Sequence, residues 1–562
     1  MTWFRNDDAI CPQLFFLNGI AGIGKSTVAS TVASMVDETG ELGASHFFSR
    51  AKGRTSPTTV FTSFAYQLSR HDRWMKKEIA QALEDDPDAG FQVIKDQFRK
   101  LIVEPLARLP HPRHRVLLVI DALDECQEAG AVELLAHLLS QLQNIPFVKV
   151  LITGRPEHHI TSTLNQRAAH QAVVMHDIEQ HIVEKDIELF YRVRFEELQE
   201  RYRDMGILWK WTEGQLRELI RRAGKLFIYA VTVYNYLGDS AVSDPAEQMN
   251  AILDASAVPG SSSPYAELDG LYLQLLQFCI PQGRQDPRLV NRFRQVVGSI
   301  VTLVEPLSVS SLALLLDISE DQVRASLVKL PSVISVPALP GIPLEIYHPS
   351  FPDFLHDSAR CVDERFLVQP AESHSFLAIR CLSCLVSNLK RDICDIGRPL
   401  KLNADVQDLD DRVKVAISPW LRYACIHWGE HVAKASVDDQ EIKQHLEDFC
   451  KYSLLHWLEA LSLLGCLEKA APFLRGVQVW AVSCTTIPIW INDSTSYRFR
   501  NLQVLRTRSS VYCMTYRARF QHSSRSLALA HFISTTPSFH FYRSTPKYVK
   551  LTRMPDGRAL GW

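Results

Sequence analysis

The sequence predicts an α/β domain, a parallel sheet with helices on both faces, followed by mostly α-helical domains including a winged helix. Short apolar runs at 14–17, 116–120 and 147–152 each lead into a polar or glycine-containing turn, as buried parallel strands do. Apolar residues recur at helical spacing in 57–107, which would cover the sheet, and in 178–238. A Pro/Gly/Ser-rich segment at 255–265 then divides the chain.

Length and composition exclude several classes of protein. The 562 residues allow three or four domains at roughly 150 residues each. The net charge of -2 gives no overall attraction to nucleic acid or anionic membranes. Twelve scattered cysteines and no secretory leader favour reduced thiols in the cytoplasm. Because 297–316 contains Glu305 and Pro306, no membrane span is expected.

The first apolar run leads into GIAGIGKST, residues 19–27. In a strand–turn–helix setting, G-x-x-x-x-G-K-[ST] binds phosphate, which predicts a P-loop NTPase holding ATP or GTP. Backbone N–H groups would surround the anion at a helix N-terminus. Lys25 would reach the β- and γ-phosphates and the Ser26 hydroxyl would bind Mg²⁺. The expected nucleotide contacts are Gly19, Gly22, Ile23, Gly24, Lys25, Ser26 and Thr27.

The second run, 116–120, ends in the acidic cluster DALDEC. Asp121 stands at the carboxyl end of the strand, where open α/β sheets bind ligands, and is the predicted second Mg²⁺ ligand. Asp124 and Glu125 follow within one turn and could orient or deprotonate the water that attacks the γ-phosphate. The alternative interpretation is a solvated loop or a helix N-cap.

The third run, 147–152, continues into GRPEHH. Arg155 would then lie at the same sheet edge as Lys25 and Asp121, where a guanidinium could sense the γ-phosphate. An exposed arginine in a turn is the alternative. Three strand ends are thus predicted to converge on one ligand.

Together, LNGIAGIGKST, VLLVIDALDEC and LITGRPE resemble the NACHT ATPases of filamentous fungi, NLR-like proteins of the STAND class of signal-transducing P-loop NTPases. The resemblance extends over residues 10–495. Its later segments are HDIEQHIVEKDIELF (176–190), GKLFIYAVTVYNYL (224–237), YHPSFPDFLHD (347–357) and PWLRYACIHWGEHV (419–432).

The resemblance implies a signalling switch that holds ADP when closed and exchanges it for ATP, which opens the protein and drives self-association. Slow hydrolysis would reset it. The positions that match are Lys25 and Ser26 in the phosphate loop, Asp121 and Glu125 as magnesium and hydrolysis carboxylates, and Arg155 as sensor. His348 matches a winged-helix histidine that touches the nucleotide, with a core histidine as the alternative.

This sequence departs from the family at two positions. Gly154 stands where a serine is more usual, and Phe227 stands where animal relatives carry a proline that contacts the base, so the purine stays open. The family also usually carries an effector segment before the loop and repeats after the helices. A natural short form and an incomplete gene model are both compatible with the chain.

Beyond the linker, LVNRFRQVVGSIVTLV, VSSLALLLDI and SEDQVRASLVKL predict three helices, the last opened by a capping box of Ser319 and Gln322. SVISVPALPGIPLEIYH predicts a strand, a wing and a strand. Winged helices often bind DNA, but Glu320 and Asp321 would repel phosphates from the recognition helix. An intramolecular lever is therefore favoured, and nucleic acid is not an expected partner.

Residues 371–477 are expected to be helical, with Cys381 and Cys384 as two core thiols, because no partner pair follows at zinc spacing. From Tyr497 the chain is basic and aromatic, which favours a poorly ordered tail over an RNA- or lipid-binding one. The predicted divisions are an N-terminal lead (1–12), a NACHT P-loop NTPase domain (13–168), a small helical domain (169–254), a linker (255–266), a winged-helix domain (267–362), a second helical domain (363–490) and a tail or connector to absent repeats (491–562).

The predicted function is a switch that binds a magnesium nucleoside triphosphate, hydrolyses it slowly, with ATP favoured over GTP, and couples nucleotide state to opening and oligomerisation. The alternatives are a non-cycling scaffold or truncated NLR-like fragment, and a metabolic kinase or motor. The last pair would need a second substrate site or a track-binding surface, neither of which is legible in the sequence. The activating signal and the protein partners are not encoded in a recognisable motif.

Overall fold

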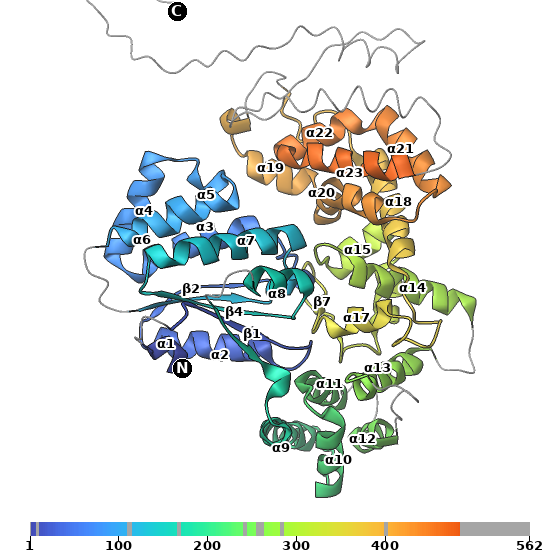
Figure 1. Ribbon diagram of the computed structural model, residues 1–562. Helices are drawn as coiled ribbons and strands as arrows, with labels where there is room; N and C mark the ends of the chain where they lie inside the picture. The colour runs from blue at the N-terminus through green and yellow to red at the C-terminus, as the bar shows by residue number, and fades with distance from the viewer. Residues whose placement is uncertain are drawn as a thin grey trace, which may run out of the picture.

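The computed structural model describes residues 2–6, 11–109, 115–165, 170–239, 244–254, 263–280, 286–397 and 403–483. Within these residues, a sheet domain is followed by a long series of helices (Figure 1). The predicted tail and most of the predicted linker, 255–262, lie outside the described residues.

Five parallel strands form the sheet in the order β2-β3-β4-β1-β5. Their bounds are β1 Leu14–Asn18, β2 Leu42–Phe47, β3 Val116–Asp121, β4 Val148–Gly154 and β5 His170–Val174. The three predicted strands are confirmed. The sequence analysis missed β2 and β5, because LGASHF and HQAVV lack the continuous apolar run of the other three.

The strand order brings three chain segments to one edge. β4 lies between β1 and β3, with Leu17 paired to Thr153 and Ile120 paired to Ile152. From β1 the chain crosses to the far edge at β2, whereas β5 lies on the other side of β1. Ligands of open α/β sheets bind at such a reversal, outside the carboxyl ends of the strands.

Side chains of the strands alternate between two apolar layers. Leu14 and Phe16 of β1 pack with the helices of one face, and Leu17 packs with the other face. α1 (Thr2–Arg5) and α2 (Lys25–Glu38) cover that second face (Figure 1). The first face carries α3 Val60–His71, α4 Arg73–Asp85, α5 Ile94–Phe98, α6 Glu104–Ala107 and α7 Glu128–Gln141. The helical covering predicted for 57–107 is thereby confirmed.

Between β4 and β5 the chain forms α8 (His158–Asn165), which packs on the first face of the sheet. The helices after the sheet begin with α9 Gln180–Asp204, α10 Glu213–Ala223, α11 Phe227–Leu237 and α12 Pro245–Asp254. They continue with α13 Ala266–Cys279, α14 Pro287–Thr302, α15 Val309–Leu316, α16 Glu320–Leu327 and α17 Ser350–His356. The predicted capping box opens α16, since Ser319 Oγ accepts from Gln322 N–H and the Gln322 amide oxygen accepts from Ser319 N–H.

An antiparallel pair, β6 (Ile334–Ser335) and β7 (Glu345–Ile346), follows α16. These are the elements that the winged-helix prediction requires, and the assignment itself stays a prediction. The last described helices are α18 Pro370–Asn388, α19 Leu409–Ala416, α20 Pro419–Lys434, α21 Gln440–Tyr452, α22 Leu454–Leu463 and α23 Ala470–Ser483.

One apolar cluster runs through the helices from α9 to α23. Cys381 and Cys384 are buried in it, and among the described residues no three or more His, Cys, Asp or Glu side chains are grouped so that they could hold a metal ion. Among the helices of the described ranges, none combines the length and the apolar character that a membrane crossing needs.

Candidate functional site

The glycine-rich turn joins β1 to α2 and contains two residues in the left-handed backbone region. Gly22 has φ 81° and Gly24, the N-cap of α2, has φ 101°. A Cβ at Gly22 would stand 2.2 Å from Cγ2 of Ile228. Conformation and space therefore both require glycine here, and a turn of this shape can direct backbone N–H groups toward an anion. Ile23 is buried, so its side chain belongs to the core and only its backbone is suited to a ligand.

Lys25 is the first residue of α2, and its side chain folds back over the turn. Its Nζ donates to the carbonyl oxygens of Gly19 at 2.8 Å and Ile20 at 3.0 Å. Burial lowers the pKa of Lys25, and the Asp124 carboxylate partly opposes that shift. The ammonium thus stands inside the loop, where it could exchange two carbonyl oxygens for phosphate oxygens.

Asp121 ends β3 at the predicted position, the carboxyl end of the strand, and is almost fully buried. The Thr153 hydroxyl donates to its Oδ1. Burial raises the pKa of Asp121, and the hydroxyls of Thr153 and Ser26 act in the opposite direction. The structure therefore brings Ser26 and Asp121 together, which is the oxygen donor set that Mg²⁺ prefers. Thr27 is exposed on the first turn of α2.

Thr153 was missed by the sequence analysis, although a single hydroxyl in the apolar strand VKVLITG is a usable signal. Besides binding Asp121, its Oγ1 accepts from the backbone N–H of Ala122 at 3.0 Å. Ala122 has φ 55° and ψ 49°, a left-handed conformation that a non-glycine residue rarely adopts. Strain of this kind persists where surrounding contacts hold the backbone, and here it turns the chain from β3 into the acidic cluster.

Asp124 holds Arg155 rather than facing the loop freely. Its Oδ1 accepts from the backbone N–H of Arg155 at 3.0 Å, and its Oδ2 lies 3.1 Å from Arg155 Nε. Both carboxylate oxygens are thus engaged, so the geometry favours a positioning role over the predicted role of orienting water. Glu125 accepts from the backbone N–H of Arg50 at 2.7 Å, and burial raises its pKa. Of the two carboxylates, Glu125 remains the better candidate for contact with water.

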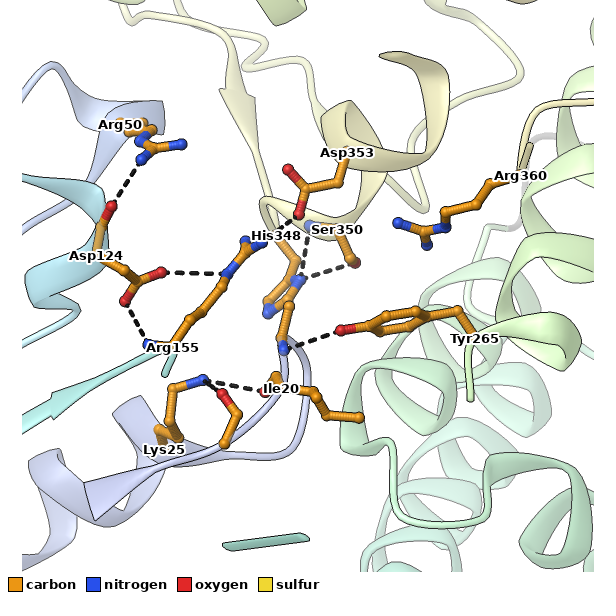
Figure 2. A network of polar contacts seen from close by, with 12 residues as sticks. Ile20, Lys25, Arg50, Asp124, Arg155, Tyr265, His348, Ser350, Asp353 and Arg360 are labelled. Carbon is orange, nitrogen blue, oxygen red and sulfur yellow. Dashed lines mark hydrogen bonds and ion pairs between the residues drawn. The ribbon is translucent and has the colours of Figure 1, made fainter. Parts of the chain in front are cut away.

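Arg155 also reaches out of the sheet domain. Its Nη1 lies 2.8 Å from Oδ2 of Asp353 in α17 (Figure 2). Burial would lower the pKa of Arg155, but the carboxylates of Asp353 and Asp124 outweigh it and the pKa is raised. The alternative of an exposed arginine in a turn is wrong, because this guanidinium is mostly buried and paired on two sides.

His348 lies over the turn, with its ring between Arg155 and the loop (Figure 2). Its Nδ1 accepts from Ser350 N–H at 3.1 Å and lies 2.8 Å from Ser350 Oγ. Burial and the nearby Arg155 and Lys25 lower the pKa of His348 to about 3. The ring is therefore neutral, and the bond to Nδ1 places its proton on Nε2. A Cβ at Gly22 would be 3.7 Å from His348 Cε1, so the imidazole faces the loop.

Two further contacts to the loop were not predicted from the sequence. The backbone N–H of Ala21 donates to the Tyr265 hydroxyl at 3.1 Å, from the start of α13. The backbone N–H of Ile228, in α11, donates to the carbonyl of Gly22 at 3.1 Å. Elements up to about 330 residues along the chain thus meet at one turn, which sequence spacing cannot reveal.

One comparison with known proteins falls on the sheet domain. The family described as Nephrocystin 3, N-terminal, matches residues 1–155, which include the loop, the acidic cluster and Arg155. A search of curated proteins finds no match. A solved structure of a Walker-type ATPase of Pyrococcus abyssi is 16% identical, with 61% of this chain and 90% of that chain covered. Its TM-score of 0.29 is too low to support an argument.

Proposed function

We propose that this protein is a nucleotide-dependent switch that binds a magnesium nucleoside triphosphate at the loop 19–27, hydrolyses it slowly, and opens and self-associates in response. One observation carries the proposal. Three segments outside the sheet domain meet the turn suited to phosphate: Ile228 and Tyr265 are hydrogen-bonded to it, and His348 faces it. A ligand entering this turn would therefore lie next to groups of the helical part of the molecule.

Each predicted group has a place in this proposal. The turn and Lys25 would hold the phosphates at the N-terminus of α2. Ser26 and Asp121 would hold Mg²⁺, which supplies neutralisation of phosphate charge. Arg155 would contact the terminal phosphate, Glu125 would orient water, and the Nε2–H of His348 is suited to donate to a phosphate oxygen.

Switching requires that two nucleotides bind the open and closed molecules with different affinities, because a ligand with equal affinity for both shifts nothing. The two-sided pairing of Arg155 supplies such a difference. A guanidinium that turned to a terminal phosphate would weaken its contact with Asp353 and loosen α17 from the sheet domain. Self-association through the surfaces so exposed is the proposed output.

The first test is calorimetric binding of ATP, ADP, GTP and GDP with and without Mg²⁺, on wild type and on Lys25→Ala. We expect Lys25→Ala to lower affinity about 100-fold or more, since it removes a charged donor from a partly buried anion site. Lys77→Ala, an exposed lysine on α4, is the matched control and should bind as wild type does.

The second test is size-exclusion chromatography with light scattering in ATP and in ADP. A switch should form larger assemblies with ATP than with ADP, and Lys25→Ala should abolish the difference. Nucleotide binding without any change in assembly would instead support the non-cycling scaffold. Equal nucleotide affinity of wild type and Lys25→Ala would show that the loop 19–27 is not the nucleotide-binding site.

A further inference from the structure

Two donors that a phosphate would use are already bound to oxygen atoms from outside the sheet domain. Ala21 N–H donates to the Tyr265 hydroxyl at 3.1 Å, and Arg155 Nη1 lies 2.8 Å from Asp353 Oδ2. Tyr265 is the residue before α13, and Asp353 lies in α17. Backbone amides and guanidinium groups are the donors that bind phosphate oxygens most often in proteins.

The two contacts lie on the side of the turn that His348 covers (Figure 2). Burial raises the pKa of the Tyr265 hydroxyl, and both Arg155 and Asp353 are near enough to act on it. In Figure 2, Arg155 and Tyr265 approach the turn from opposite sides of His348. Since Arg155 is the predicted sensor of the terminal phosphate, this side of the turn is where a third phosphate would lie.

The Tyr265 hydroxyl is held in position by its own neighbours. The guanidinium of Arg360 lies 4.4 Å from the centroid of the tyrosine ring. Arg360 is itself fixed by the buried Asp269, with Nη2 at 2.6 Å from Oδ1 and Nε at 3.1 Å from both carboxylate oxygens. A cation–π contact and a charge-assisted fork therefore orient the ring toward the loop.

We propose that Tyr265 and Asp353 together occupy the place of the terminal phosphate, so that the closed molecule accepts a nucleoside diphosphate and a triphosphate binds only by displacing both side chains. The inference rests on the proposed function and adds which residues set the preference. The donors are satisfied by oxygen in either state, so the exchange leaves no buried N–H unpaired. Displacement of both residues would release α13 and α17 from the turn.

The test compares ADP with the non-hydrolysable analogue AMPPNP, both with Mg²⁺, and GDP with GMPPNP in parallel. Tyr265→Phe keeps the ring and its contact with Arg360 but removes the hydroxyl. Asp353→Asn keeps the shape but removes the charge. The measured quantity is the ratio of the triphosphate Kd to the diphosphate Kd.

We expect this ratio to fall about 3- to 10-fold in Tyr265→Phe, which loses one neutral hydrogen bond, and about 10-fold or more in Asp353→Asn, which loses a charged one. Tyr347→Phe, a half-exposed tyrosine beside His348, is the control and should leave the ratio unchanged. If Tyr265 merely caps a buried amide, Tyr265→Phe should change the affinities for the diphosphate and the triphosphate by the same factor. The ratio of the two Kd values would then stay at its wild-type value, and that result would overturn the proposal.

Hydrogen exchange of the loop supplies a readout that needs no nucleotide. The Ala21 amide should exchange slowly in nucleotide-free wild type and faster in Tyr265→Phe. In the control variant Tyr347→Phe it should exchange at the wild-type rate. Unchanged exchange in Tyr265→Phe would contradict the contact on which the inference depends. If wild type binds none of the four nucleotides, the proposed function fails. If wild type binds and the variants keep its ratio, only this inference fails.

Discussion

Two interfaces of this molecule are built from different chemistry. Where the sheet domain meets the helices, polar contacts form what we call the polar seam: Arg155 with Asp353, Ala21 with Tyr265, and Lys52 with Glu345. Beside it, Gly53 lies against the aliphatic part of Glu305. Between α18 and α20, by contrast, buried apolar residues of both helices belong to one cluster. Some apolar contact also crosses the seam, since Ile228 covers Gly22.

This difference indicates where the molecule can open. Separating apolar helices exposes area to water at roughly 25 cal/mol per Å², with nothing in water to replace the contact. Polar groups at the seam can instead exchange one partner for another, including water or a phosphate oxygen, at little net change in free energy. We therefore expect the helices to remain packed together while the seam responds to ligand.

The largest expected effect lies in the apolar interior. Trp457 is fully buried in α22, and its Nε1 donates to the carbonyl of Cys425 in α20 at 2.8 Å. Trp457→Ala should lower the free energy of unfolding by about 3–5 kcal/mol through the cavity and the unpaired carbonyl. Urea denaturation followed by circular dichroism measures this. A loss below about 1 kcal/mol would contradict the view that these helices form a tightly packed body.

The second-largest expected effect on stability concerns the ion pair of Arg155 and Asp353 across the polar seam. Asp353→Asn should lower the free energy of unfolding by only about 1–2 kcal/mol, because the pair is partly solvated, yet it should expand the molecule. Small-angle scattering would detect the larger radius of gyration.

Lys52→Ala serves as the matched control, since it breaks an exposed pair across the same seam, 3.5 Å long. Its effect should be at most about 0.5 kcal/mol, without expansion. Equal expansion in both variants would mean that no single contact holds the seam.

A third prediction concerns pH and a contact beside the seam. His427 of α20 lies 3.4 Å from Glu305 and 3.6 Å from Glu430. Burial lowers the pKa of His427, but the two carboxylates outweigh it and the pKa is raised; the pKa of Glu305 is lowered, first by its contact with His427. The contact should thus stabilise the fold most between the ordinary pKa values of Glu and His, 4.5 and 6.5.

Above pH 6.5 the stabilisation should disappear as the histidine loses its proton, and below pH 4.5 as the carboxylate gains one. We expect His427→Gln to be destabilised relative to wild type by about 1 kcal/mol more at pH 6 than at pH 9. Thermal melts of both proteins at the two pH values measure this. A difference that does not vary with pH would mean that the histidine is neutral throughout.

The smallest expected effect is a gain in the free energy of unfolding. Ala122 adopts a left-handed conformation that glycine reaches without strain, so Ala122→Gly should raise the free energy of unfolding by about 0.5–1 kcal/mol. Because the substitution lies on the sheet side, it should leave the radius of gyration unchanged. Destabilisation instead would indicate that the methyl group contributes packing that outweighs the strain.

Much of the site could be predicted from local patterns. Gly22, Gly24 and Lys25 follow from a strand, a glycine turn and a helix, and the parallel order of β1, β4 and β3 then places Asp121 and Arg155 at the same edge. The helices of 57–107 and the capping box of α16 follow from periodicity and from one hydrogen-bonding pattern. Local chemistry determines these features whatever the rest of the chain does.

The tertiary structure decided which partners those groups meet. Asp124 was predicted to orient or deprotonate the attacking water and instead holds Arg155. For His348 the sequence allowed a core position, whereas the side chain faces the turn. Tyr265 stands about 240 residues from the loop, in the predicted linker, and Asp353 about 330 residues from it, in the segment 347–357, where the sequence pattern did not mark it as a partner of Arg155. Contacts of this kind depend on how whole helices pack, a sum of many small apolar terms over long separations, which no short stretch of sequence contains.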